Sequence, residues 1–189
     1  MPGINEIIKE AVEVLRQGGV ILYPTDTIWG LGCDATNSDA VKRIYSIKKR
    51  DDSQSMLVLL DIESKLQYYV KEVPEIAWQL IEVSDRPLTL IYPGARNIAP
   101  ELVAGDGSIG MRIVNDEFCS SLIARFRKPL VSTSANISGE AAPGNYAEIS
   151  NAIKELVDYI VPLRMEEKDK KTASSIIKID TDGRFKILR

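Results

Sequence analysis

The alternation of short apolar runs with helix-periodic segments limits what this chain can fold into more than any other feature. Apolar runs of strand length occur at 20–23, 55–60, 87–92, 108–114 and 129–136. Between most of them, apolar residues recur at three- or four-residue spacing, at about 5–17, 38–48, 74–81, 118–126 and 146–158. Such interleaving predicts an α/β fold in which helices pack on a sheet.

Three further strand-like runs close the chain, at 159–163, 174–179 and 184–188. Because they come close together, we expect antiparallel pairs among them and hence a mixed parallel and antiparallel sheet. The 189 residues contain no internal repeat and no low-complexity linker. We therefore expect one α/β domain over 1–189, with a twisted mixed sheet flanked by helices.

The chain has no histidine, and its two cysteines, Cys33 and Cys119, stand in unrelated contexts. Histidine-based catalysis, histidine-ligated zinc and a disulfide framework are therefore excluded. Since the net charge is −3, an anion site must be a local cluster of Lys and Arg. No apolar run is long enough to cross a bilayer, and the acidic, amphipathic N-terminus is unlike a signal peptide. We expect a cytoplasmic protein without a membrane partner.

Lys48, Lys49 and Arg50 form a cationic cluster at the end of the predicted helix 38–48. Cations in a last helical turn complement the helix dipole, and this alone can account for the cluster. Lys48 and Arg50 are two residues apart, however, directly before a loop in which both can face one polyanion. A lysine supplies a point charge and an arginine a planar fork, a pair that suits a triphosphate.

Hydroxyl and amide side chains crowd the stretch STSANISG, 132–139, directly after a buried run. One interpretation is a polar turn whose Ser and Asn side chains cap their own backbone. Five hydrogen-bonding side chains in seven positions exceed what a turn needs. Together with backbone N–H groups they can hold a phosphate or a carboxylate. The stretch is not a Walker A loop, and no dinucleotide-binding glycine motif follows a strand.

The stretch YPTDTIWGLG, 23–32, adds polar residues and glycines directly after an apolar strand. If PTDT is extended, Thr25 and Thr27 share one face and Asp26 points the other way. The glycines allow a tight turn or a close approach of the backbone to a ligand. Arg112, within another apolar strand, either faces solvent or aims into a cleft to bind a carboxylate. These groups stand at separate strand ends, where α/β sheets bind ligands.

Several segments occur together in the order and spacing of one known family: GGVILYPTDTIWGLGCDA, IYSIKKR, RPLTLIYPG, GMRI, PLVSTSANISG and the closing SSIIKI and KILR. The sequence resembles the short, single-domain form of the YrdC-like family, the threonylcarbamoyl-adenylate synthases, over residues 5–189. The resemblance implies an open α/β domain with a deep, positively lined groove. It also implies the activity: L-threonine, bicarbonate or CO₂, and ATP with its Mg²⁺ give threonylcarbamoyl-adenylate and pyrophosphate.

The resemblance further implies which residues form the site. The family's K-x-R and S-x-N signature, which would hold the triphosphate and nucleotide, falls on Lys48, Arg50, Ser134 and Asn136. Lys48 and Arg50 would be the catalytic cations. Further nucleotide contacts would come from Gln54, Ser108 and Arg189. The threonine side would be lined by Thr27, Arg112, Ser132 and Ser174, with Arg112 on the carboxylate. No protein metal ligand is implied.

The product implied by the resemblance serves tRNA modification. It would supply the threonylcarbamoyl group of N6-threonylcarbamoyladenosine at position 37 and pass to the tRNA threonylcarbamoyl-transferase complex, with weak binding of tRNA or double-stranded RNA. One alternative is an RNA-binding module without catalysis, using Lys42, Arg43 and 48–50, although the negative net charge disfavours it. Another is a carbamoyl-adenylate-forming enzyme with a different acceptor. Release of pyrophosphate that depends on threonine would distinguish the threonylcarbamoyl-adenylate synthase from this enzyme.

Overall fold

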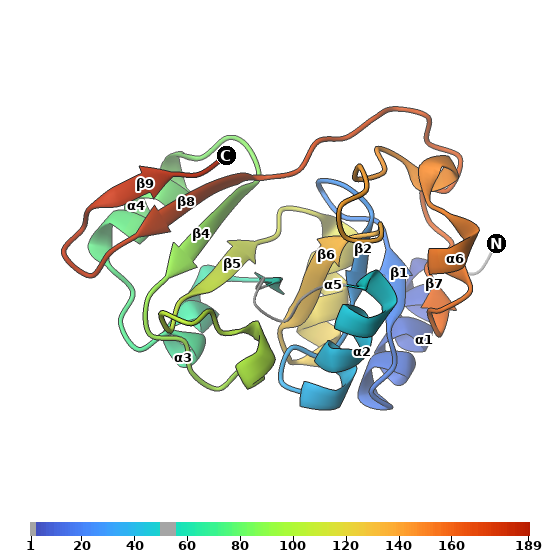
Figure 1. Ribbon diagram of the computed structural model, residues 1–189, viewed down its shortest axis with the longest axis horizontal. Helices are drawn as coiled ribbons and strands as arrows, with labels where there is room; N and C mark the ends of the chain where they lie inside the picture. The colour runs from blue at the N-terminus through green and yellow to red at the C-terminus, as the bar shows by residue number, and fades with distance from the viewer. Residues whose placement is uncertain (1–2, 50–55) are drawn as a thin grey trace.

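The computed structural model describes residues 3–49 and 56–189, whose strands form one mixed sheet (Figure 1). Its helices are α1 (Ile4–Arg16), α2 (Ser38–Lys48), α3 (Leu66–Tyr69), α4 (Glu75–Val83), α5 (Glu117–Phe126) and α6 (Asn151–Lys154). Its strands are β1 (Ile21–Tyr23), β2 (Gly30–Gly32), β3 (Leu57–Leu60), β4 (Leu88–Tyr92), β5 (Ile109–Ile113), β6 (Leu130–Ser134), β7 (Tyr159–Ile160), β8 (Ser175–Ile179) and β9 (Phe185–Ile187). The predicted α/β class is confirmed.

Strand order in the sheet is β7-β1-β2-β6-β3-β5-β4-β8-β9 over the described residues. The pairs β1–β7, β3–β5 and β4–β8 are parallel, and the other neighbours are antiparallel, which confirms the mixed sheet. The last three strands do not stay together, however. β8 and β9 pair antiparallel as expected, whereas β7 lies at the opposite edge beside β1, and 161–174 runs across between them (Figure 1).

The carboxylate of Asp158 helps to hold β7 beside β1. Asp158, directly before β7, accepts the N–H of Val20 at 2.7 Å and forms an ion pair with Arg43 of α2 at 2.5 Å. These contacts span 138 and 115 residues of sequence. Local pattern cannot predict such a pairing, because the partners come together only in the folded chain.

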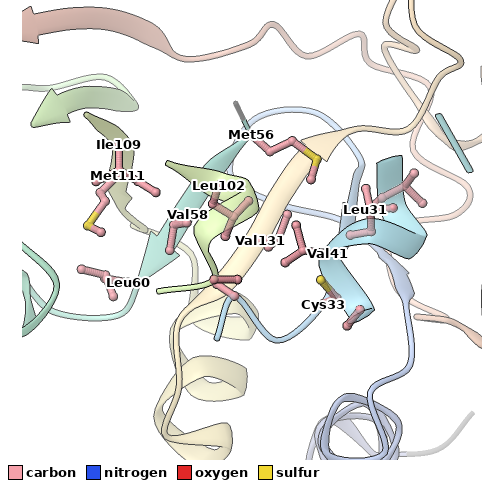
Figure 2. Packing of buried hydrophobic residues seen from close by; sticks show 14 of the residues in the cluster. Leu31, Cys33, Val41, Met56, Val58, Leu60, Leu102, Ile109, Met111 and Val131 are labelled. Carbon is pink, nitrogen blue, oxygen red and sulfur yellow. The ribbon is translucent and has the colours of Figure 1, made fainter. Parts of the chain in front are cut away.

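Helices cover both faces of the sheet, since the strands alternate their side chains between two apolar clusters. Ile21 and Tyr23 of β1 pack with α1 and α5, whereas Leu22 between them packs in the cluster on the other face. Figure 2 shows part of this second cluster, in which Val41 of α2 packs on the sheet. The apolar stripes read from the sequence thus become the two layers of the core.

The helix predicted at about 146–158 is wrong as a single element. The structure has a 3₁₀ turn at Tyr146–Glu148 and then the short α6. Ser150 separates them: its backbone is extended (φ −64°, ψ 147°) and its Oγ accepts the N–H of Ile153 at 3.4 Å. A serine that caps a new helix competes with continuation of the preceding turn, which apolar periodicity does not register.

Candidate active site

A cavity of about 480 Å³ draws its walls from β2, β3, β4, β5, β6 and β8, a size that suits a small ligand. The predicted site residues that line it are Thr27, Ser108, Arg112, Ser132, Ser134, Ser174 and Arg189. Residues predicted on the nucleotide side and on the threonine side therefore share one cavity. Lys48 and Asn136 lie beside its Ser134 wall, and Arg50 and Gln54 lie outside the described residues.

Lys48 is placed by the end of α2. Asn37 begins this helix by accepting the N–H groups of Asp39 and Ala40, and Lys49 ends it in a left-handed conformation at φ 49°. The last helical side chain, Lys48, is 1% exposed, and its ammonium donates to the carbonyl oxygens of Ser134 at 2.5 Å and Asn136 at 2.7 Å.

The contacts of Lys48 match neither interpretation of the cationic cluster fully. Its ammonium donates to the last residue of β6, 86 residues away, and to the loop that follows. In return, the carbonyl of Lys48 accepts the N–H of Ser138 at 2.8 Å. Lys48 therefore ties α2 to the polar loop that the sequence predicts as an anion site.

Asn136 has its amide group turned along the same loop. Its Nδ2 donates to the carbonyls of Ile137 and Glu140, each at 2.9 Å. Its Oδ1 is buried and has no hydrogen-bond partner among the described residues. A buried acceptor without a partner is unfavourable, and a ligand donor would relieve it.

Arg112 of β5 aims inward, the second of its two predicted orientations. It is 2% exposed and lines the cavity. One guanidinium nitrogen, Nη1, forms an ion pair with Asp26, and Nη2 donates to the Thr27 hydroxyl at 3.3 Å. Its Nε is buried and has no hydrogen-bond partner among the described residues.

The extended conformation considered for the PTDT stretch is wrong, because the backbone bends at 26–28. The Oγ1 atoms of Thr25 and Thr27 are 2.9 Å apart, and Asp26 and Thr27 both contact the guanidinium of Arg112. Thr25 Oγ1 also accepts the N–H of Thr27 at 3.0 Å, a serine–threonine turn that stiffens the loop. The hydroxyl of Thr27 is therefore presented to the cavity from a fixed backbone.

The glycines that follow form β2, a strand that the sequence analysis does not predict. A Cβ on Gly32 would lie 2.6 Å from Cε1 of the buried Tyr23 ring and 3.0 Å from the carbonyl oxygen of Val131. The Tyr23 hydroxyl itself donates to Val131 O at 3.2 Å. Gly32 is thus required by close packing between β1 and β6, and not by a turn.

A second anchor holds the Thr25 backbone. Arg164 donates to the carbonyl of Thr25 at 3.2 Å and pairs with Asp116 at 2.5 Å. Asp116 also caps α5, since its Oδ1 accepts the N–H of Cys119 at 2.9 Å. Burial raises the pKa of Asp116, but the Cys119 N–H and the Arg164 guanidinium outweigh it and leave this pKa below its ordinary value.

Asp116→Asn is expected to lower stability at pH 7 by about 1 kcal/mol through loss of the ion pair. A lowered folded-state pKa stabilises the protein fully above about pH 4, the ordinary range of aspartate, and this stabilisation is lost as the pH falls through the lowered value. The difference in Tm between wild type and variant should therefore shrink on acidification. Melting curves from pH 7 to 3, with the exposed Asp182→Asn as control, measure this; a constant difference would contradict it.

Two cavity residues were missed by the sequence analysis on the β4–β8 side. Thr89 of β4 and Ser174 share a buried hydroxyl contact of 2.8 Å, and Arg189 Nε donates to the carbonyl of Ser174 at 3.0 Å. Lys178 of β8 also lines the cavity. Thr89 and Lys178 each interrupt an apolar strand, as Arg112 does, and this signal could have found them.

Lys178 pairs with a carboxylate, Asp106, that also lines the cavity. Its ammonium lies 2.5 Å from Asp106, which also accepts from the Ser108 hydroxyl at 2.6 Å. Hydrogen bonds from Lys178 and then Ser108 lower the pKa of Asp106. The cationic side chains that line the described cavity are Arg112, Lys178 and Arg189, and Asp106 is the acidic one.

The described residues give little support for a cysteine nucleophile or a protein-bound metal ion. Cys33 and Cys119 are free and buried, and burial raises the pKa of both thiols, which disfavours a nucleophilic thiolate. No group of three or more Cys, Asp or Glu side chains in 3–49 and 56–189 is arranged to hold a metal ion. Over the same residues, no helix is long and apolar enough to cross a membrane.

The fold and the cavity define an α/β protein with a hydroxyl- and cation-lined site, in which alternate residues of β4, β5, β6 and β8 place the cavity against one face of the sheet. A family model for Sua5, YciO and YrdC, described as "Telomere recombination", matches residues 13–189. The chain belongs to this family. The threonylcarbamoyl-AMP synthase of Halorhodospira halophila is 31% identical over 159 residues, which are 84% of this chain and 83% of that protein. That of Pseudoalteromonas translucida is 34% identical over 157 residues, 82% and 84% of the two chains.

Solved structures agree with the family. YciO from E. coli superposes with a TM-score of 0.84 at 26% identity, over all of this chain and 90% of that one. Sua5 from P. abyssi, solved in complex with L-threonine, gives a TM-score of 0.86 at 26% identity. This chain spans about half of that protein, 55% of its length.

Proposed function

We propose that the chain is a threonylcarbamoyl-AMP synthase, which joins L-threonine, bicarbonate and ATP into threonylcarbamoyl-adenylate, pyrophosphate and water. The observation that carries the proposal is the single cavity in which residues predicted for both substrates meet. The names of the sequence relatives support the same activity. In this proposal the cavity is the positively lined groove implied by the sequence resemblance.

Positioning and electrostatics account for the proposed chemistry. The neutral threonine amine attacks CO₂ and loses one proton, or attacks bicarbonate with loss of water, and a carbamate forms. A carbamate oxygen then attacks the α-phosphorus as the bond to pyrophosphate breaks. Lys48 and Arg50 neutralise the leaving pyrophosphate, and Mg²⁺ enters with ATP as part of the substrate. Neither a protein nucleophile nor a histidine is required, which suits a chain without histidine.

In this proposal the cavity residues divide between the two substrates. Arg112 binds the threonine carboxylate, and Thr27, Ser132 and Ser174, which line the same cavity, also belong to the threonine site. The nucleotide side consists of Ser108, Ser134, Asn136, Arg189 and Gln54. The product then passes in the cytoplasm to the enzyme complex that modifies adenosine 37 of tRNA, with weak RNA binding during transfer.

The direct test is pyrophosphate release from ATP and bicarbonate, with and without L-threonine, followed by mass detection of the adenylate. Threonine-dependent release with the threonylcarbamoyl-adenylate mass is the expected result. Release that does not depend on threonine would point to a different acceptor. RNA affinity with a steep salt dependence and no ATP turnover would replace the proposal with a binding module.

Arg112→Ala is expected to raise KM for threonine and leave KM for ATP within about twofold of wild type. A hydrogen bond to a charged group contributes roughly 1.5–3 kcal/mol, which corresponds to about a tenfold to hundredfold change. Arg184→Ala is the matched control, because this arginine is 80% exposed and pairs with Asp182 away from the cavity. An effect of Arg112→Ala on ATP alone would show that the division of the cavity is wrong.

A further inference from the structure

Asp26 is the acidic residue of the PTDT stretch, and nothing in the proposed reaction uses it. Its side chain is 9% exposed and faces the guanidinium of Arg112, 86 residues further along the chain. It does not belong to the lining of the cavity, whereas Arg112 does. Any effect of Asp26 on a ligand in the cavity must therefore pass through Arg112.

The carboxylate of Asp26 is held at both oxygens. Oδ1 accepts a hydrogen bond from Nη1 of Arg112, and Oδ2 accepts the backbone N–H of Asn115 at 3.3 Å. The backbone on either side is fixed by the Thr25–Thr27 turn and by Arg164. Asp26 thus joins the loop after β1 to the end of β5 and is a rigid support for the arginine.

Asp26 and Thr27 together fix the orientation of the Arg112 guanidinium. Nη1 donates to the Asp26 carboxylate and Nη2 donates to the Thr27 hydroxyl. The buried Nε has no hydrogen-bond partner among the described residues. A free arginine has several rotatable bonds, whose freedom is lost on binding. A guanidinium already held by a carboxylate and a hydroxyl presents its remaining N–H donors without that loss.

We propose that Asp26 is a positioning residue that fixes the Arg112 guanidinium for the carboxylate of the amino-acid substrate. The proposal rests on the proposed function, which places that carboxylate at Arg112. Asp26 also keeps the buried arginine paired when the cavity holds no ligand, since an unpaired buried cation is strongly unfavourable. Its effect should therefore fall on the amino acid and not on the nucleotide.

Asp26→Asn, which preserves the shape of the side chain and removes its charge, tests the inference. Steady-state pyrophosphate release should give a KM for threonine raised about tenfold and a KM for ATP within about twofold of wild type. The control is Asp34→Asn, because the Asp34 side chain is 5% exposed, against 9% for Asp26, and is also paired with a cation, Lys128 at 2.5 Å, but lies outside the cavity lining. Asp34→Asn should lower Tm without changing KM for threonine.

A double-mutant cycle shows whether Asp26 acts through Arg112. In an Arg112→Ala background, Asp26→Asn should change KM for threonine by less than about twofold, because the group that it positions is gone. A tenfold effect in both backgrounds would overturn the inference, as would an unchanged threonine KM in the single variant. Equal losses for threonine and ATP would also overturn it, because they would indicate a purely structural role.

A second variant and a wild-type control keep the test decisive if Asp26→Asn fails to fold or the protein has no synthase activity. If Asp26→Asn does not fold, as judged by its melting curve, Asp26→Glu keeps the charge and displaces the carboxylate by one methylene. It should again raise KM for threonine selectively, and a wild-type value would overturn the inference. Failure of the proposed function is distinguishable, because wild-type protein would then release no pyrophosphate in a threonine-dependent manner.

Discussion

Lys48→Met is expected to lower turnover by about a hundredfold or more, the usual loss when a positioned charge at a reacting group is removed. Two effects combine. The cation beside the proposed phosphate site disappears, and the carbonyl oxygens of Ser134 and Asn136 lose the ammonium that contacts them at 2.5 and 2.7 Å. The polar loop would then no longer be held against α2.

The measurement is kcat for threonine-dependent pyrophosphate release, together with Tm to separate turnover from folding. Methionine keeps the unbranched stem of lysine, so the packing of the side chain changes little. Lys42→Met is the matched control: Lys42 lies on the same helix, is 59% exposed and pairs with Glu101 at 3.2 Å. Turnover near wild type in Lys48→Met, with Lys42→Met equally active, would refute the role of Lys48.

Gly32→Ala is expected to destabilise the protein by about 1–3 kcal/mol, as overpacking of a well-filled core usually does. The added Cβ would lie 2.6 Å from the Tyr23 ring and 3.0 Å from the Val131 carbonyl. Tyr23 is fully buried and hydrogen-bonded to that same carbonyl, so it has little room to move. For a chain of this length Tm should fall by roughly 3–10 °C.

Gly110→Ala is the matched control for stability, because Gly110 also lies in a strand and its added Cβ would meet nothing closer than 3.6 Å. Ordinary van der Waals contact should leave Tm close to wild type. Thermal and urea unfolding of both variants measure the difference. A Gly32→Ala protein as stable as Gly110→Ala would show that β2 can shift to accept the methyl group, against the packing explanation.

Strong local patterns predicted much of the fold. The helix at 38–48 and the strands at 87–92 and 108–114 agree with α2, β4 and β5 to within a residue. Their apolar periodicity is a local signal, so these elements can be predicted without knowledge of any tertiary contact. β2 was missed because its three residues, Gly-Leu-Gly, carry no strand propensity, and only the neighbours β1 and β6 give it a ladder.

The composition of the candidate site was accessible from the sequence, and its internal pairing was not. Polar side chains that follow or interrupt apolar runs indicated Thr27, Arg112 and Ser132, which all line the cavity. Their binding roles stay predictions. The partner of Arg112 could not be foreseen, since any of the chain's carboxylates could have faced it, and sequence spacing carries no information across 86 residues.

The amino-acid sequence by itself determined the α/β class, the two apolar layers and the set of polar residues available for a site, because these depend on patterns a few residues long. Only the tertiary structure shows that β7 pairs with β1 and not with β8. It also shows that the Lys48 ammonium contacts the end of β6 and the loop after it, and that Asp26 pairs with Arg112. Each of these joins segments far apart in the chain. Such contacts depend on how the whole core packs, which no local pattern encodes.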